Sequence, residues 1–196
     1  MGKIKYLTDI ENFIDKNKVF CIKDIQRFLM SKKANPKYAY LLLHNMAKKR
    51  KINRVIKGYY TKYDDPMLIA YCIKPSYVGL ESALSLYGMW EQESNVVLVT
   101  PRRVRYGVRN VFKTNVVIRP IAKEYFFGYD YVDYYDLKIP VSDIEKTFID
   151  LVFYKSYIDK NLLRIFKRKM NTEKLKEYLK HYNKRFIDRV ERILGV

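Results

Sequence analysis

The chain has 196 residues, 48% of them hydrophobic, and a formal net charge of +18, a composition that predicts a globular protein of one large or two small domains. No hydrophobic run approaches the roughly 20 residues that span a bilayer, and residues 1–10 lack the apolar block of a signal peptide, so we expect a cytoplasmic protein without membrane association. Cys21 and Cys72 lie in apolar segments and His44 and His181 are the only histidines, which disfavours a disulfide or a zinc site; we expect no metal and no other cofactor.

Three helices are predicted at the N-terminal end. Apolar residues at helical spacing, among them Ile4 and Leu7, predict a first helix that ends at Lys16-Asn17-Lys18, and a second helix is predicted over residues 22–30. The third helix begins with Asn35 as N-cap and Pro36 at the first helical position. Its core-facing residues are Ala39, Leu42, Leu43 and Met46.

A β-hairpin is predicted directly after the third helix. Residues 52–56 and 59–61 alternate about the turn Lys57-Gly58, where glycine suits a tight turn. Three helices followed by a basic hairpin predict a winged helix-turn-helix domain. The domain is expected to cover residues 1–65, because Asp64-Asp65-Pro66 interrupts the pattern. We place the domain boundary there.

The third helix and the hairpin are the predicted site for double-stranded DNA. The outward side chains of the helix suit base edges in the major groove, and the basic residues that follow suit phosphates. The predicted base-edge residues are Asn35, Lys37, Tyr38, Leu41, His44 and Asn45, and the predicted phosphate contacts are Lys48, Lys49, Arg54 and Lys57.

The second predicted domain, residues 66–196, mixes helices and strands. Helices are expected over 66–73 and 79–88, the latter closed by Gly88, and strands over 96–100, 116–120, 125–128 and 131–137. Ser142 and Glu145 form an expected capping box that opens a helix ending near Tyr154, and three amphipathic helices follow it. The fold class is therefore α+β.

Positive charge is concentrated at the two ends of the chain. Residues 1–62 carry 16 Lys and Arg against 4 Asp and Glu, residues 63–154 carry 10 against 12, and residues 155–196 carry 13 against 5. Within the nearly neutral middle, Arg102, Arg103, Arg105 and Arg109 are clustered. We expect them to form a second basic surface that extends the DNA footprint or contacts a partner, with a solvated loop as the alternative.

The order of motifs resembles the AbiEi family of type IV toxin–antitoxin antitoxins and transcriptional regulators. The resemblance is carried by Lys57-Gly58-Tyr59-Tyr60 after a basic helix, by Pro75–Gly88 and by Val141–Leu151, which together span most of the chain. The chain departs from the family where Asp143-Ile144-Glu145-Lys146 replaces a Pro-Glu-Lys and where Pro120 replaces a histidine. The resemblance implies an autorepressor that binds its own operator and an antitoxin, in a viral-defence operon, that counters a nucleotidyltransferase-like toxin; inverted half-sites would place two copies on one operator.

Two alternatives to a DNA-binding regulator are open. Clustered carboxylates in residues 81–150 suggest a metal-dependent nuclease or nucleotidyltransferase as one alternative. The acid spacing typical of either class is absent, and helix caps and strand edges account for these acids. We therefore expect no enzymatic activity. The 19 tyrosines and the basic tail suggest an RNA-binding protein as the other alternative, although most of the tyrosines fall at core-facing positions.

Overall fold

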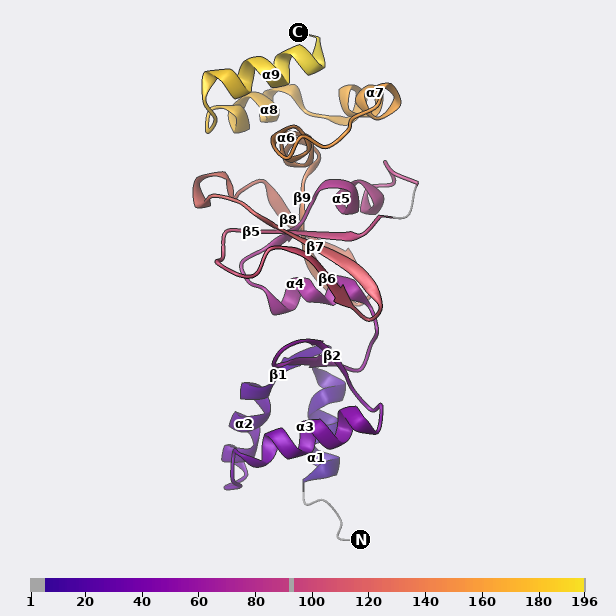
Figure 1. Cartoon of the computed structure of the whole chain (residues 1–196), viewed down its shortest axis with the longest axis vertical. Coiled ribbons are helices and arrows are strands. Elements are labelled where there is room, and N and C mark those ends of the chain that lie inside the picture. The colour runs from indigo at the N-terminus through magenta and orange to yellow at the C-terminus, as the bar shows by residue number, and fades with distance from the viewer. Residues whose placement is uncertain (1–5, 92–93, 196) are drawn as a thin grey trace. The chain divides into compact units, whose positions relative to one another are not determined.

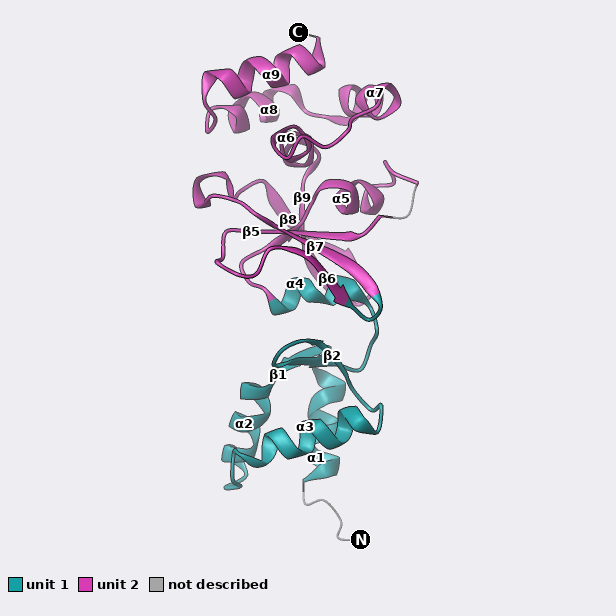
Figure 2. Ribbon diagram, viewed as in Figure 1, with its two compact units in different colours: residues 1–72, 111–113 teal, residues 73–110, 114–196 magenta. Residues whose placement is uncertain are grey.

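The computed structural model describes residues 6–91 and 94–195 and divides into two compact units (Figure 2). The first unit extends to Cys72 and includes Val111–Lys113, and the second comprises Ile73–Asn110 and the chain from Thr114 onward. Both units combine helices with a sheet, so the predicted α+β class is confirmed. No helix within the described ranges has both the length and the apolar character needed to cross a membrane.

The first unit is a bundle of helices with a small antiparallel sheet. Its strands are paired in the order β1-β3-β2. In chain order its elements are α1 (Leu7–Lys16), β1 (Val19–Cys21), α2 (Ile22–Ser31), α3 (Tyr38–Lys48), β2 (Asn53–Ile56), β3 (Tyr59–Thr61), a 3₁₀ turn (Pro66–Leu68) and α4 (Ile69–Cys72) (Figure 1).

The core of the first unit is formed by the apolar stripes of its helices. Ile10 of α1 and Ile25 of α2 are completely buried. In α3 the four residues predicted to face the core, Ala39, Leu42, Leu43 and Met46, are all buried in the same cluster. The helical spacing of apolar residues therefore identified this face correctly.

The expected start of the third helix was wrong, the compact unit extends beyond the expected boundary at residue 65, and one expectation lies outside the described residues. Helix α3 begins at Tyr38 because Asn35 forms a separate turn, in which its Oδ1 accepts the Lys37 N–H at 2.9 Å and its carbonyl accepts the Tyr38 N–H at 3.1 Å. The unit continues past Asp65 because α4 contacts β2. Ile4, assigned to the first helix, is among residues 1–5, which are not described.

The second unit is built on a mixed sheet. Its strands lie in the order β6-β7-β5-β4-β9-β8, with β5 parallel to β7 and β4 parallel to β9. Its elements are β4 (Tyr77–Val78), α5 (Leu80–Leu86), β5 (Val96–Thr100), β6 (Gly107–Val111), β7 (Thr114–Pro120), a 3₁₀ turn (Lys123–Tyr125), β8 (Tyr129–Tyr134), β9 (Leu137–Ser142), α6 (Ile144–Phe153), α7 (Lys160–Lys169), α8 (Thr172–Leu179) and α9 (Lys184–Leu194) (Figure 1).

Some strands of the second unit differ from the expected ones. Residues 125–128 are not a strand, because the rings of Tyr125 and Phe126 stack on Tyr182 and Tyr77, with centroids 4.5 and 5.3 Å apart. The strand expected over 131–137 is divided between β8 and β9, which pair antiparallel. The end of α5 was predicted correctly: Gly88 has φ 63°, and the Met89 N–H returns to the Leu84 carbonyl.

The capping box expected at Ser142 and Glu145 is also wrong. Asp143 is the N-cap of α6, and its Oδ1 accepts the Lys146 N–H at 2.7 Å. Its Oδ2 accepts the Tyr178 hydroxyl at 2.7 Å, and burial together with this bond raises the pKa of Tyr178 to about 12. Glu145 accepts the Asn171 N–H at 2.7 Å instead of returning to Ser142. Both acids therefore connect α6 to α8 and its N-cap.

Helix α6 lies between the sheet and helices α7 to α9, so almost all of its residues are buried (Figure 1). This position explains a buried ion pair, in which the Lys146 ammonium bonds Asp150 Oδ1 and lies 3.3 Å from the Tyr182 hydroxyl. The Tyr77 hydroxyl donates to Asp150 Oδ2 at 2.7 Å. The prediction that Asp150 is a helix cap or a strand-edge acid was therefore wrong, because its carboxylate lies in this buried ion pair.

Gly128 is required where the chain passes α6. Its φ is 67°, and a Cβ on it would lie 2.8 Å from Tyr178 Cε2 and 2.9 Å from Lys146 Cβ. We expect Gly128→Ala to lower the free energy of unfolding by about 2–3 kcal/mol, the sum of a left-handed backbone and an overpacked contact. Urea denaturation measures this change.

Gly88→Ala is the matched control, because Gly88 has φ 63° and open space around its Cβ position. It is expected to cost only the backbone contribution, about 1 kcal/mol. Equal losses in the two variants would contradict a role for the contact with Tyr178 and Lys146.

Candidate nucleic-acid interface

The face of α3 opposite the core is exposed and carries mixed chemistry. Leu41 and Tyr40 are 55% and 60% exposed, and Lys37, His44 and Lys48 are exposed beside them. These residues provide cations, an imidazole, a phenol and an apolar group along one helix face. Such a set can contact base edges, thymine methyl groups and phosphates together.

Most of the predicted contact residues are exposed, and two are not fully so. Tyr38 is half-buried and packs against the core cluster, and Asn45 is half-buried. Tyr40 is not in the predicted set, although it lies three residues after Lys37 and four before His44 and hence on their face. The exposed members of the predicted set are Asn35, Lys37, Leu41, His44, Lys48, Lys49, Arg54 and Lys57.

The β2–β3 hairpin carries Arg54 and, at its turn, Lys57. Gly58 completes the turn with φ 85°, and its carbonyl accepts the Ile22 N–H at 3.0 Å. The turn is therefore fastened to the first residue of α2. Arg54 is exposed, and the pairing of β2 with β3 shifts between Arg54 and Ile56.

The ion pairs of the first unit lie outside the predicted DNA-binding site. The acids of residues 6–62 each pair with a cation outside the predicted site: Asp9 with Lys32 at 3.3 Å, Glu11 with Lys51 at 2.5 Å, Asp24 with Arg27 at 3.7 Å, and Asp15 with Lys62. Among the described residues, none of the predicted phosphate contacts forms an ion pair. The positive potential of α3 and the hairpin is thus not cancelled by neighbouring carboxylates.

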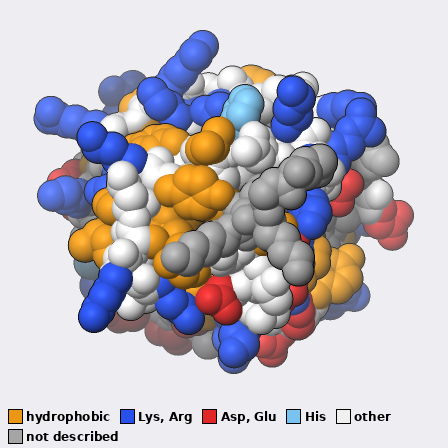
Figure 3. Space-filling view, turned by 90° about the horizontal axis from the view of Figure 1, so that it is seen from below, with side chains coloured by type: hydrophobic (Ala, Val, Ile, Leu, Met, Phe, Trp, Pro, Cys, Tyr) orange, Lys and Arg blue, Asp and Glu red, His pale blue; other side chains and the backbone are white. Residues whose placement is uncertain are grey.

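The space-filling view shows how side chains of each kind are distributed on one face. In Figure 3, hydrophobic side chains gather left of the middle, Lys and Arg side chains lie mainly above them and to their left, and Asp and Glu side chains lie mostly toward the lower and right-hand parts. Cations beside accessible apolar groups are suited to a polyanion with apolar features, as duplex DNA has in its major groove.

The four arginines of the predicted second basic surface differ in their contacts. Arg102 donates to the Lys74 carbonyl at 3.0 Å, and the Arg109 guanidinium donates to the Arg105 carbonyl. Arg109 lies in β6 and is half-buried, and burial, with a contribution from the Arg105 charge, lowers its pKa. Arg103 and Arg105 are exposed. Two arginines therefore fasten the loop, and the other two are exposed to solvent.

Across residues 6–91 and 94–195, no group of three or more His, Cys, Asp or Glu side chains is placed to hold a metal ion.

The fold itself is shared with a solved structure. The chain matches no family model and no curated protein. It is similar to the crystal structure of the RV2827C protein from Mycobacterium tuberculosis, with a TM-score of 0.65 and 11% sequence identity, over 99% of this chain and 78% of that one. At this identity the similarity shows the fold alone.

Proposed function

We propose that the protein is a sequence-specific, double-stranded DNA-binding transcriptional regulator, and that its first unit is a winged helix-turn-helix. The order of helices and strands in this unit supports the proposal, with α2 and α3 as the helix pair and the β2–β3 hairpin as the wing. The observation that carries it is the exposed face of α3, whose cations have no ion-pair partner among the described residues.

In this proposal α3 lies in the major groove. Leu41 and His44, with Tyr40 added to the predicted set, reach base edges, because they occupy the middle of the exposed helix face. Lys48 and Lys49 at the end of α3, and Arg54 and Lys57 on the hairpin, bind phosphates.

The resemblance to the AbiEi family extends the proposal to an autorepressor and antitoxin acting in the cytoplasm. The expected functional partner is a nucleotidyltransferase-like toxin encoded beside this gene. Growth of cells that express that neighbouring gene, with and without this protein, tests the antitoxin role separately from DNA binding. Failure to restore growth removes the antitoxin role and leaves the regulator proposal standing.

A footprint on the DNA upstream of the protein's own coding region tests the regulator proposal. We expect a protected site that survives excess random duplex, and inverted half-sites within it would place two copies on one operator. Single-stranded RNA is the competitor that separates the two kinds of nucleic-acid binding. If RNA abolishes the footprint at a concentration at which random duplex does not, the result would favour the RNA-binding alternative and contradict this one.

Arg102, Arg103, Arg105 and Arg109 are proposed to extend the DNA footprint as a second basic surface. Because Arg102 and Arg109 also fasten the loop, the variant that tests the charge alone is Arg103→Gln/Arg105→Gln. We expect it to shorten the footprint and to lower the slope of log K against log salt by roughly 2, about 0.9 for each lost phosphate contact. An unchanged footprint and an unchanged slope would show that the loop is only solvated.

A further inference from the structure

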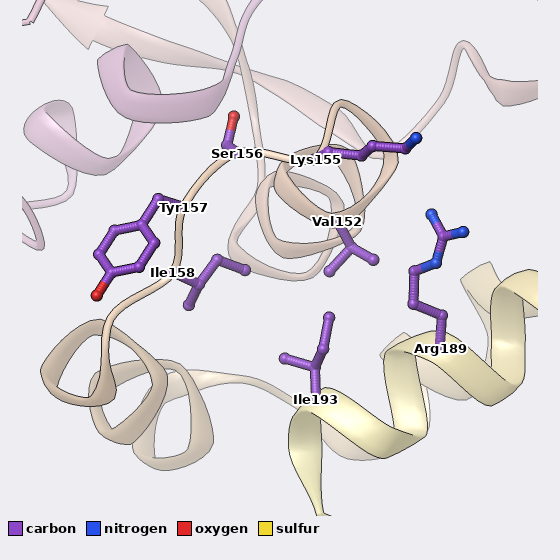
Figure 4. Close-up of a pocket in the computed structure, with 7 residues that line it drawn as sticks. All are labelled: Val152, Lys155, Ser156, Tyr157, Ile158, Arg189 and Ile193. Carbon is purple, nitrogen blue, oxygen red and sulfur yellow. The ribbon is translucent and has the colours of Figure 1, made fainter.

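The second unit contains an open pocket of about 500 Å³ that the proposed DNA interface does not use. It lies between the end of α6, the segment that follows it and helix α9 (Figure 4). Its floor is formed by Val152, Ile158 and Ile193. A pocket of this size with an apolar floor falls within the range of small-molecule sites in proteins.

Two cations lie at one end of this pocket. Figure 4 shows the side chains of Lys155 and Arg189 at the same end, while Tyr157 lies at the other. Within the described part of the chain, neither cation forms an ion pair. The pocket therefore offers an uncompensated positive end and an apolar body.

The position of Lys155 is set by the end of α6. Lys155 has φ 57°, its N–H donates to the Val152 carbonyl at 3.2 Å, and the Ser156 N–H returns to the Leu151 carbonyl at 2.9 Å. This arrangement closes a helix with a left-handed residue, a position that glycine occupies most readily. These backbone hydrogen bonds, and not the lysine side chain, fix the position of residue 155 at the rim of the pocket.

We propose that the pocket binds a small apolar carboxylate, such as a medium-chain fatty acid. The carboxylate pairs with Lys155 and Arg189, and the hydrocarbon chain lies over Val152, Ile158 and Ile193. Charge complementarity selects this occupant, because carboxylates form charge-assisted hydrogen bonds with both cation types. A single charged end group fits better than an acidic peptide, because the cations are gathered at one end and not spread along the pocket.

Calorimetric titration of the full chain with decanoate, decylammonium and acetate tests the proposal. We expect saturable binding of one decanoate per chain, and binding at least about tenfold weaker for the other two, since each lacks one of the complementary parts. Binding of decylammonium as tight as that of decanoate would overturn the proposal, as would no binding of decanoate. No DNA is present, so the result is independent of the proposed regulator function.

Two variants locate the site. Lys155→Gly and Arg189→Gln are each expected to weaken decanoate binding about tenfold, the effect of one lost charge-assisted contact. Glycine suits the left-handed backbone of position 155, so this variant keeps the fold, and an unchanged or higher Tm verifies that.

The matched controls are Lys33→Gly and Arg192→Gln. Lys33 has φ 55° in the first unit, and Arg192 is an exposed residue of α9 that does not line the pocket. Both controls are expected to bind decanoate like the original chain. Equal affinity in the pocket variants and the controls would overturn the assignment, as would a labelled acidic helical peptide that binds where decanoate does not.

Discussion

Replacing Asp150 with alanine is expected to lower the free energy of unfolding by about 3–5 kcal/mol, the largest stability change that we anticipate for a single residue. The side chains of Lys146 and Asp150 are 0% and 1% exposed. Without the carboxylate, the Lys146 ammonium stays buried without its counter-ion, and the Tyr77 hydroxyl loses its acceptor. Urea denaturation followed by circular dichroism measures the loss.

The double variant Lys146→Met/Asp150→Leu is the control for this prediction. Burial lowers the pKa of Lys146 and raises that of Asp150, which means that the protein interior disfavours both charged forms. Replacing both groups removes this desolvation cost, so the double variant is expected to be more stable than Asp150→Ala. A double variant as unstable as the sum of Lys146→Met and Asp150→Leu would contradict an interaction between the two residues.

Replacing Lys48, Lys49, Arg54 and Lys57 together with glutamine is expected to weaken DNA binding about a thousandfold near 0.15 M salt. Each cation is assigned one phosphate, so the slope of log K against log salt should fall by roughly 3.6. The loss should be the same for operator and random duplex, because phosphates carry no sequence information. Fluorescence anisotropy at several salt concentrations measures both quantities.

A second fourfold variant removes the same number of charges from the same unit. Arg27, Lys32, Lys51 and Lys62 pair with acids, so their replacement by glutamine should change the salt slope little. His44→Ala provides the contrast in specificity, with an expected cost of roughly 1–3 kcal/mol on the operator alone. Equal losses in the two fourfold variants would mean that net charge, and not the α3 and hairpin surface, governs binding.

Local signals in the sequence predicted the buried face of α3 and the hairpin of the first unit. The apolar spacing of α3 gave its buried face, and the turn Lys57-Gly58 gave the hairpin, because both depend on residues near one another in the chain. Strand β1 was not anticipated, since its three residues are defined by pairing with β3, about forty positions later. Tyr38 was wrongly placed outward, although it lies four positions before the buried Leu42 and hence on the core side of the helix.

The second unit depends more on distant contacts, which explains why less of it was foreseen. Tyr77 and Asp150 meet across 73 positions, and β4, which carries Tyr77, has only two residues. The aromatic run from Tyr125 to Phe127 has the composition of a strand, yet its rings pack against α8 and its neighbours. Composition alone does not separate these two outcomes. The pocket end formed by Lys155 and Arg189 likewise requires α9 to fold back beside α6.

The bond from the Ile22 N–H to the Gly58 carbonyl has a consequence for binding kinetics. It joins the hairpin tip to the start of α2, which packs against α3, so the hairpin is already held against the helix pair in the unbound protein. If the first unit binds DNA as proposed, little conformational entropy is lost at docking, and we expect fast association. We also expect weaker binding to operators in which the base-edge and phosphate contacts are spaced differently.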